Sequence, residues 1–112
     1  MKTGLSDVRA SGKFITLTVG ESVVARAYVF FLKNASGRTS AFVEDVYVDA
    51  KHRGQGYARI LYETIAHAAK RKKCYKIIAC SRMERDGVHA MMAKLGYRKH
   101  GYEFRLDLDP AP

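Results

Sequence analysis

Cysteine, proline and long apolar runs are scarce in this sequence of 112 residues. The two cysteines, Cys74 and Cys80, are six residues apart in one expected strand region, where a disulfide is unfavourable, and they are too few for a structural zinc site. We therefore expect two reduced thiols and no metal site. Two prolines and an apolar share of 47% argue against global disorder. No window approaches the ~20 apolar residues of a membrane span, and residues 1–6 lack a signal-peptide core. These absences predict a cytoplasmic protein without a membrane partner.

Acidic residues are also few. Eleven Asp and Glu stand against 20 Lys and Arg, which gives a net charge of +9. Such a charge favours partners that carry phosphate, namely nucleic acid, nucleotide cofactors or phosphorylated metabolites. Much of the excess lies between residues 51 and 76, and it includes the run KRKK at residues 70–73. That run also has a structural explanation, because cations at the end of a helix offset the negative end of its dipole.

Hydrophobic patterning predicts an antiparallel meander of three strands in the first half of the chain. Residues 14–19 and 23–32 are rich in β-branched and aromatic side chains, and Gly20 between them predicts a tight turn. A polar loop then leads to a third strand over residues 41–48.

The period changes to that of a helix over about residues 56–72. Its apolar stripe is wide enough to cover one face of a sheet and comprises Ala58, Leu61, Tyr62, Ile65, Ala66, Ala68 and Ala69. Residues 75–80 then read as a short, largely buried strand, placed as a parallel partner of the strand over residues 41–48 would be. The middle of the chain is therefore predicted to be a β-loop-α-β unit.

A second helix is expected over residues 88–95, with Gly96 as its C-terminal cap. Residues 97–98 and 103–108 can then form a terminal strand pair. The order βββ-α-β-α-ββ predicts an α/β (α+β) fold in one domain, residues 1–112, with a mixed, mostly antiparallel sheet and two helices.

The loop that precedes the first helix, residues 53–58 (RGQGYA), is suited to receive an anion. A strand that runs through such a loop into a helix turns several amide N–H groups toward one point at the positive end of the helix. Gly54 and Gly56 allow the backbone to come close to the anion, although a Gly-x-Gly sequence before a helix can also be a simple tight turn. Two standard phosphate loops are excluded, since there is no Gly-x-x-x-x-Gly-Lys-Ser/Thr run and Arg59 occupies the last position of Gly-x-Gly-x-x-Gly.

The segment AFVEDVYVDAKHRGQGYARILYETIAHAAKRKKCYKI resembles the core motif of the GNAT superfamily of acyl-CoA N-acyltransferases. That motif is a Val/Ile-rich strand, Arg/Gln-x-x-Gly-x-Gly/Ala and a long helix, and its defining positions here are Arg53, Gly56 and Ala58. The stretches VEDVYVDAKHRGQG, CYKII and KLGY look most like the glucosamine-6-phosphate N-acetyltransferases. The resemblance covers residues 41 to about 97.

The resemblance implies a sheet whose two central parallel strands splay apart and hold acetyl-CoA between them. The pantetheine arm would run along the backbone of Val46, Tyr47 and Val48. The pyrophosphate would be held by Arg53, Gly54, Gln55, Gly56, Tyr57 and Ala58. The N-terminal helices that usually wall the acceptor pocket are expected to be reduced or missing, because a turn at Gly20 takes their place.

Acetyl transfer to an amine requires a neutral amine, a polarised thioester carbonyl and a proton for the departing thiolate. The resemblance makes Glu44 the candidate base and the N–H of Val46 the donor to the carbonyl oxygen. Glu44 could instead be a half-exposed carboxylate that only pairs with the basic surface. Asp45 would point to the opposite face of a regular strand, though a bulge would change that.

The usual proton donor to the thiolate is missing. The resembling families commonly carry a tyrosine four residues before the helix-ending glycine, and Met92 stands there in this chain. Methionine cannot donate a proton. His89 is the candidate substitute, although a lone helix histidine is more often a surface residue. Tyr97, Tyr102, or water and backbone alone could fill the role instead.

The leading hypothesis is an N-acetyltransferase that moves acetyl from acetyl-CoA directly to a primary amine of an amino-sugar phosphate, a small amine or a protein. Direct transfer is favoured over an acyl-carrying Cys80, because a strand cysteine beside Ile77 and Ile78 is predicted to pack in the core. Two competing hypotheses are a non-catalytic acyl-CoA-binding module and, less favoured, a nucleic-acid-binding domain using residues 70–73. The resemblance also implies a possible homodimer, in which residues 97–108 would complete the partner's site.

Overall fold

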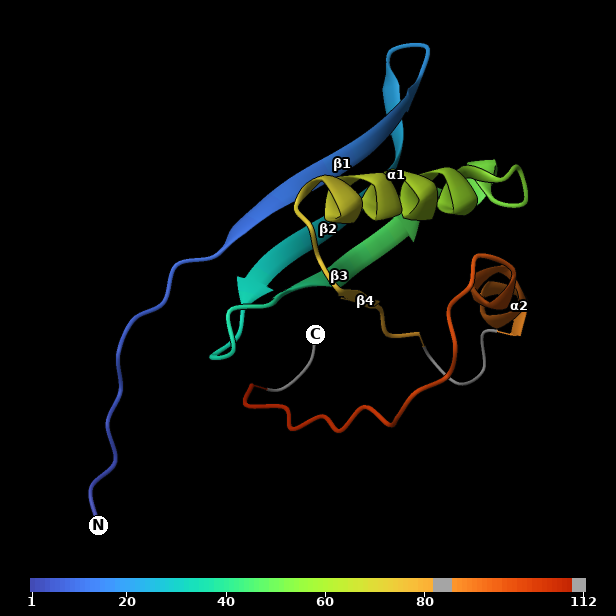
Figure 1. Cartoon of the computed structure of the whole chain (residues 1–112). Coiled ribbons are helices and arrows are strands. Elements are labelled where there is room, and N and C mark those ends of the chain that lie inside the picture. The colour runs from blue at the N-terminus through green and yellow to red at the C-terminus, as the bar shows by residue number, and fades with distance from the viewer. Residues whose placement is uncertain (82–85, 110–112) are drawn as a thin grey trace. The chain divides into compact units, whose positions relative to one another are not determined.

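A computed structural model describes residues 1–81 and 86–109 (Figure 1). The described elements are, in chain order, β1 (Ser11–Val19), β2 (Ser22–Lys33), β3 (Thr39–Val48), the 3-10 helix η1 (Ala50–His52), α1 (Tyr57–Arg71), β4 (Lys76–Ile78) and α2 (Asp86–Lys94). The chain divides into two compact units, Met1–Ala79 and Cys80–Pro112, each of which has its own description below.

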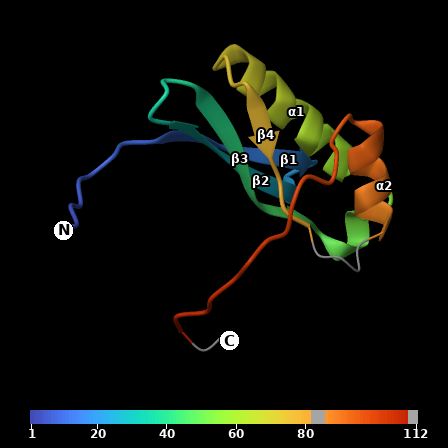
Figure 2. The same ribbon diagram turned by 60° about the horizontal axis from the view of Figure 1, so that its bottom comes forward.

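The first unit contains a mixed, mostly antiparallel sheet of strand order β1-β2-β3-β4. β1 pairs with β2 and β2 with β3 in antiparallel register, whereas β4 joins β3 in parallel after the crossover through α1 (Figure 2). The predicted meander and the parallel placement are confirmed. The strand predicted over residues 75–80 is only Lys76–Ile78, and the prediction that it is largely buried is wrong, because only its central residue is half-buried. As expected, a turn joins β1 to β2, and Gly20 takes a φ of 62° there, a conformation that favours glycine.

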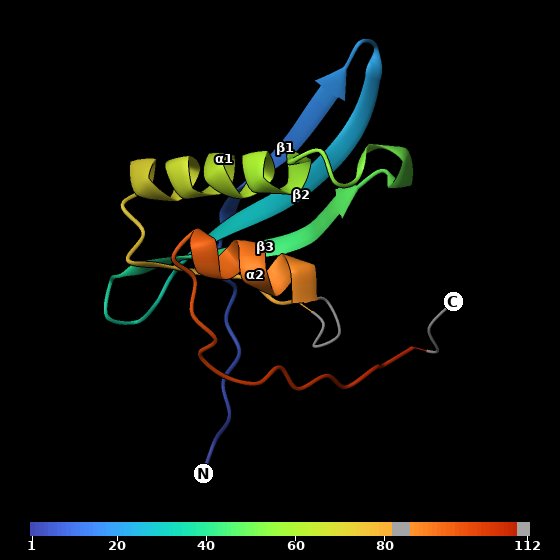
Figure 3. The ribbon, with the colours of Figure 1, turned by 90° about the vertical axis from the view of Figure 1, so that its right-hand side faces the viewer.

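Helix α1 covers one face of the sheet (Figure 3). Its predicted apolar stripe faces the strands, and Leu61 and Ile65 are fully buried. They pack in a core to which β2 contributes every second residue, including Ala27 and Val29. Complete burial of a Leu or Ile side chain stabilises the folded state by ~1.5–3 kcal/mol. The match between the helical stripe and the strand period therefore accounts for the position of α1.

The opposite face of the sheet is aromatic, and within the first unit, residues 1–79, no other element covers it. Phe14 stacks on Tyr28 with 4.6 Å between the ring centroids, and Tyr28 lies 6.1 Å from Phe30. A Cβ at Gly12 would come within 2.9 Å of the Phe30 ring, so the glycine lets that ring lie flat across β1.

The second unit contains α2, which begins and ends close to the predicted helix. Gly96 takes a φ of 92°, and its N–H donates to the carbonyl of Ala93 at 3.1 Å. The N–H of Tyr97 donates to the carbonyl of Met92 at 3.0 Å, which completes a Schellman cap. The C-terminal cap predicted at Gly96 is confirmed.

The predicted strand pair at residues 97–98 and 103–108 is wrong: no strand is present over residues 97–109. The segment keeps a strand-like alternation in which Tyr102, Phe104, Leu106 and Leu108 are 83–92% exposed. Alternation alone does not make a strand, because the ladder needs a neighbouring strand to supply its hydrogen bonds. Neither α1 nor α2 is long and apolar enough to cross a membrane, and the described residues contain no other α-helix.

Candidate functional site

Strand β3 carries a bulge in its second half. On β2, Arg26 and Tyr28 are two positions apart, but their partners on β3, Tyr47 and Glu44, are three positions apart. Asp45 absorbs the extra residue with a φ of 51°, in the left-handed region that non-glycine residues rarely adopt. The bulge therefore reverses the alternation of β3 beyond Glu44, and it occurs where the sequence allowed for one.

Asp45 points to the same face of the sheet as Glu44. Its carboxylate accepts hydrogen bonds from Arg26 at both oxygens, with Nε–Oδ2 at 3.0 Å and Nη2–Oδ1 at 3.3 Å. This pairing raises the pKa of the Arg26 guanidinium above its ordinary value. Because about half of each side chain is exposed, solvent screens the pair and its contribution to folding is small, so its main effect is on local geometry.

Tyr47 connects this pair to the glycine loop. The guanidinium carbon of Arg26 lies 4.8 Å from the centroid of the Tyr47 ring, and that of Arg53 lies 5.6 Å from it. Arg53 also donates from Nε to the carbonyl oxygen of Val48 at 3.0 Å. Local sequence patterns predict none of these contacts; the isolated charge of Arg26 within an apolar strand was the available signal.

The second half of β3 also has an edge without a strand partner. Its parallel pairing with β4 ends at the pair Phe42 and Ile78, whereas β3 continues to Val48. Within the described part of the chain, the β4-side N–H and C=O groups from residue 43 onward are therefore outside any strand ladder. The unpaired stretch includes the backbone of Val46, Tyr47 and Val48, where the splay of the two parallel strands is predicted.

The loop that follows β3 opens directly onto the N-terminus of α1. Gly54 and Gly56 have φ values of 77° and 84°, so the glycines are required by backbone conformation. Gly56 is the N-cap and provides no side-chain oxygen for the first amides of the helix. Uncapped amides at the positive end of a helix, beside the cation Arg53, provide a site for an anion.

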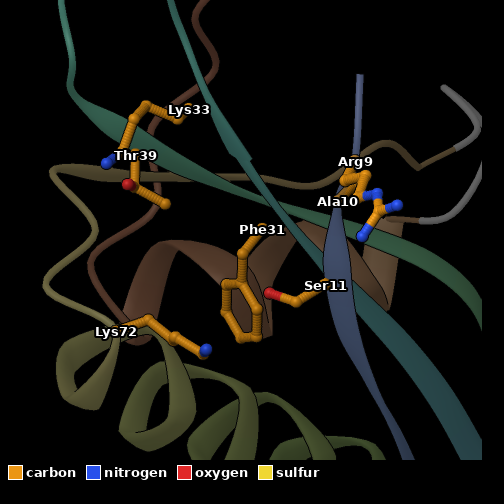
Figure 4. A pocket seen from close by; sticks show the side chains of 7 residues that line it. All are labelled: Arg9, Ala10, Ser11, Phe31, Lys33, Thr39 and Lys72. Carbon is orange, nitrogen blue, oxygen red and sulfur yellow. The ribbon is translucent and has the colours of Figure 1, made fainter. Parts of the chain in front are cut away.

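Two of the hollows on the surface of this unit bear on the position of the site. The smaller one, of about 140 Å³, adjoins the Arg26–Tyr47 contact and is lined by Val23, Val24, Ala25, Arg26, Tyr47 and Asp49. The larger one, of about 370 Å³, lies near the C-terminal end of α1, where Lys72 points toward the ring of Phe31 (Figure 4). It is far along the helix from the glycine loop, so it is separate from the site described above.

The sequence pattern of the Acetyltransferase (GNAT) family matches residues 5–97. The chain belongs to this family. Among curated proteins, it is 36% identical over 72 residues to a glucosamine 6-phosphate N-acetyltransferase from Trypanosoma brucei brucei. The matched region covers 64% of this chain and 47% of that protein, so the chain spans about half the length of this relative.

Solved structures show the same GNAT fold. An acetyltransferase from Trypanosoma brucei superposes with a TM-score of 0.74 at 29% identity, covering 88% of this chain and 69% of that one. A protein from Agrobacterium tumefaciens described as a putative acetyltransferase superposes with a TM-score of 0.77 at 24% identity, covering 86% and 68%. At 24% identity, the likeness to the Agrobacterium tumefaciens protein shows a shared fold alone.

The GNAT candidate base, Glu44, lies on the open face of the sheet and is exposed. Its register partner is Tyr28, and it sits two residues beyond the last β3–β4 pair. The carboxylate is therefore accessible next to the part of β3 that has no β4 partner.

The other candidates from the sequence, His89, Met92 and Cys80, lie in the second unit. His89 and Met92 are one turn apart on α2, and both are half-buried. Cys80 is exposed, so the prediction that it packs in the core is wrong; β4 ends at Ile78, before the cysteine. Cys74, in the first unit, is half-buried, and burial raises the pKa of its thiol; the two cysteines form no disulfide with each other.

Proposed function

We propose that residues 1–112 act as one N-acetyltransferase domain that moves an acetyl group from acetyl-CoA to a primary amine by direct transfer. The observation that carries this proposal is the β3 edge that lacks a ladder beyond Phe42 and leads into an uncapped helix N-terminus. An amide-rich arm can pair with such an edge as an added strand, while the loop takes the charged end.

The residues present fit acetyl-CoA. The amides of residues 54–58 and the cation Arg53 would hold the pyrophosphate, and the glycine at 56 gives the left-handed backbone that opens the loop. The N–H and C=O groups of residues 46–48 would pair with the pantetheine arm. When bound, acetyl-CoA supplies the activated acyl group.

Three groups of this chain are assigned to the chemistry. Glu44 takes a proton from the acceptor ammonium, directly or through water, so that the amine nitrogen can bond to the acyl carbon. The N–H of Val46 donates to the carbonyl oxygen as negative charge develops there. With acetyl-CoA bound, the nitrogen would lose its second proton to water as the carbon–sulfur bond breaks, and His89 would give a proton to the departing sulfur. Of the three, His89 takes over the role of the tyrosine whose position Met92 occupies.

The first acceptor to test is glucosamine 6-phosphate. The curated relative is named for that substrate, and the net charge of +9 suits a phosphorylated amine. Small amines and protein amines are the next candidates, because no helix of the first unit walls the open face on which Glu44 lies.

The deciding experiment measures binding and turnover separately. We expect millimolar acetyl-CoA to raise the melting temperature, since a ligand at 100 times its Kd stabilises the folded state by about 2.7 kcal/mol. We expect release of the CoA thiol when glucosamine 6-phosphate or another amine is added. No thermal shift at millimolar acetyl-CoA would overturn the proposal.

A second candidate function follows from Met92. A chain that binds acetyl-CoA but lacks a proton donor on α2 would be a non-catalytic acyl-CoA-binding module. Binding without CoA release from any class of amine would favour this module over the enzyme.

We also propose that the chain forms a homodimer through its C-terminal segment. Tyr102, Phe104, Leu106 and Leu108 alternate with charged residues and are almost fully exposed. An alternating segment of this kind can be stabilised by adding to the edge of a sheet, which would bury these four side chains.

A further inference from the structure

The side chain of Arg26 contacts residues on both sides of the β3 bulge. Its guanidinium donates to both carboxylate oxygens of Asp45 and lies over the ring of Tyr47. Asp45 holds the left-handed conformation that makes the bulge, and Tyr47 is the first residue that pairs again with β2. One side chain thus connects the irregular residue to the point where regular pairing resumes.

We propose that Arg26 is a positioning residue, which holds the bulge and thereby sets the direction of Glu44 and of the backbone at residues 46–48. The inference rests on the proposed function, because those backbone groups are the ones assigned to acetyl-CoA. Arg26 touches neither the acceptor nor the acyl group in this assignment; it acts through Asp45 and Tyr47.

The alternation of β3 explains why the bulge needs to be held. In a regular strand, Asp45 and Tyr47 would lie on the same face as Val43, which is the buried face covered by α1. The bulge instead places Asp45 and Tyr47 on the face of Arg26, together with Glu44. Loss of the bulge would bring the Asp45 carboxylate toward the core. It would also turn the amides of residues 46–48 away from the β3 edge that has no β4 partner.

The contact geometry requires an arginine. A guanidinium is planar and can donate to both oxygens of one carboxylate while its face lies on an aromatic ring. A lysine retains the charge, but its three N–H donors sit on one tetrahedral nitrogen, so it lacks the planar fork that makes both contacts. Arg53 then extends the same network to the glycine loop through the Tyr47 ring and the carbonyl of Val48.

The test compares Arg26→Met, Arg26→Lys and Asp45→Asn in the full chain. The affinity for acetyl-CoA is measured by calorimetry well below the melting temperature, and NMR reports hydrogen exchange and chemical shifts of the amides at residues 45–48. We expect both Arg26 variants to bind acetyl-CoA about 5- to 20-fold more weakly, and those amides to exchange faster. The double variant Arg26→Met/Asp45→Asn should be no weaker than Arg26→Met, because the two residues act as one unit.

Two controls separate positioning from charge and from general stability. Arg38→Met also removes one arginine charge. The guanidinium carbon of Arg38 lies 3.7 Å from the centroid of the Tyr75 ring, near the other end of β3. Val29→Ala weakens the core, where Val29 is fully buried, without touching the bulge. Both should retain the wild-type affinity within twofold at a temperature at which the proteins are folded.

The outcomes distinguish this inference from the proposed function. Wild-type affinity and unchanged exchange at residues 45–48 in both Arg26 variants would overturn the inference, as would an equal loss in Arg38→Met. If the wild-type chain itself does not bind acetyl-CoA, the proposed function fails, and exchange at residues 45–48 still decides whether Arg26 holds the bulge. If Arg26→Met does not fold, Arg26→Lys and Asp45→Asn carry the same test.

Discussion

Phe42 and Ile78 form the last pair of the parallel ladder between β3 and β4. Beyond this pair β4 ends, while β3 continues through Glu44 and the bulge to Val48. The end of one short strand therefore exposes the backbone of the longer one, directly before the loop that begins α1. The proposed acetyl-CoA site depends on this difference in strand length.

Replacement of Gly56 by alanine should remove acetyl-CoA binding. An L-residue at a φ of 84° is strained by about 1–2 kcal/mol, which lowers the melting temperature by several degrees and disfavours the loop conformation that presents the amides. Thermal unfolding with and without acetyl-CoA measures both effects. Gly37→Ala is the matched control, since Gly37 has the same φ and equally open surroundings in a distant loop. An acetyl-CoA shift as large in Gly56→Ala as in Gly37→Ala would contradict the assignment of the loop.

Glu44→Gln should abolish turnover and leave acetyl-CoA binding intact. Removal of a general base costs about 10²- to 10⁴-fold in kcat, whereas the exposed Glu44 side chain contributes little to the donor site. Steady-state release of the CoA thiol, combined with calorimetry, separates the two effects. Glu63→Gln serves as the control, because Glu63 pairs with Arg59 on the exposed side of α1. Retention of full activity in Glu44→Gln would show that another group accepts the proton.

Leu61→Ala should destabilise the chain by about 2–5 kcal/mol, whereas the neighbouring Ile60→Ala should cost well under half of that. Leu61 is fully buried between α1 and the sheet, while 43% of Ile60 is exposed. Urea unfolding followed by circular dichroism provides the comparison. Equal losses in the two variants would mean that α1 does not cover the sheet with the Leu61 face.

The C-terminal segment should govern the oligomeric state. Phe104→Ser and Leu106→Ser should each shift the chain from dimer to monomer in light scattering at fixed concentration, because each removes an apolar side chain that the dimer would bury. Arg105→Ser lies between them on the charged side and should leave the dimer unchanged. A wild-type chain that is monomeric at high micromolar concentration would rule out this role for the segment.

Much of the fold could be predicted from local patterns. The three antiparallel strands, the long helix and the short strand after it follow from hydrophobic periods, which reflect backbone geometry. The glycine cap of α2 follows in the same way, since a φ of 92° at Gly96 favours the one residue without a Cβ. The predicted strand pair near the C-terminus failed because its alternation needs a partner ladder that residues 97–109 do not have.

Neighbours along the chain are enough to place the glycine loop, the stripe of α1 and Glu44 near the end of a Val-rich strand. Contacts between distant residues set where the β3–β4 ladder stops and on which side of the sheet Asp45 lies. Both depend on residues far apart in sequence: Phe42 with Ile78, and Asp45 with Arg26. Strand register and a paired bulge come from such contacts, so no local period reports them.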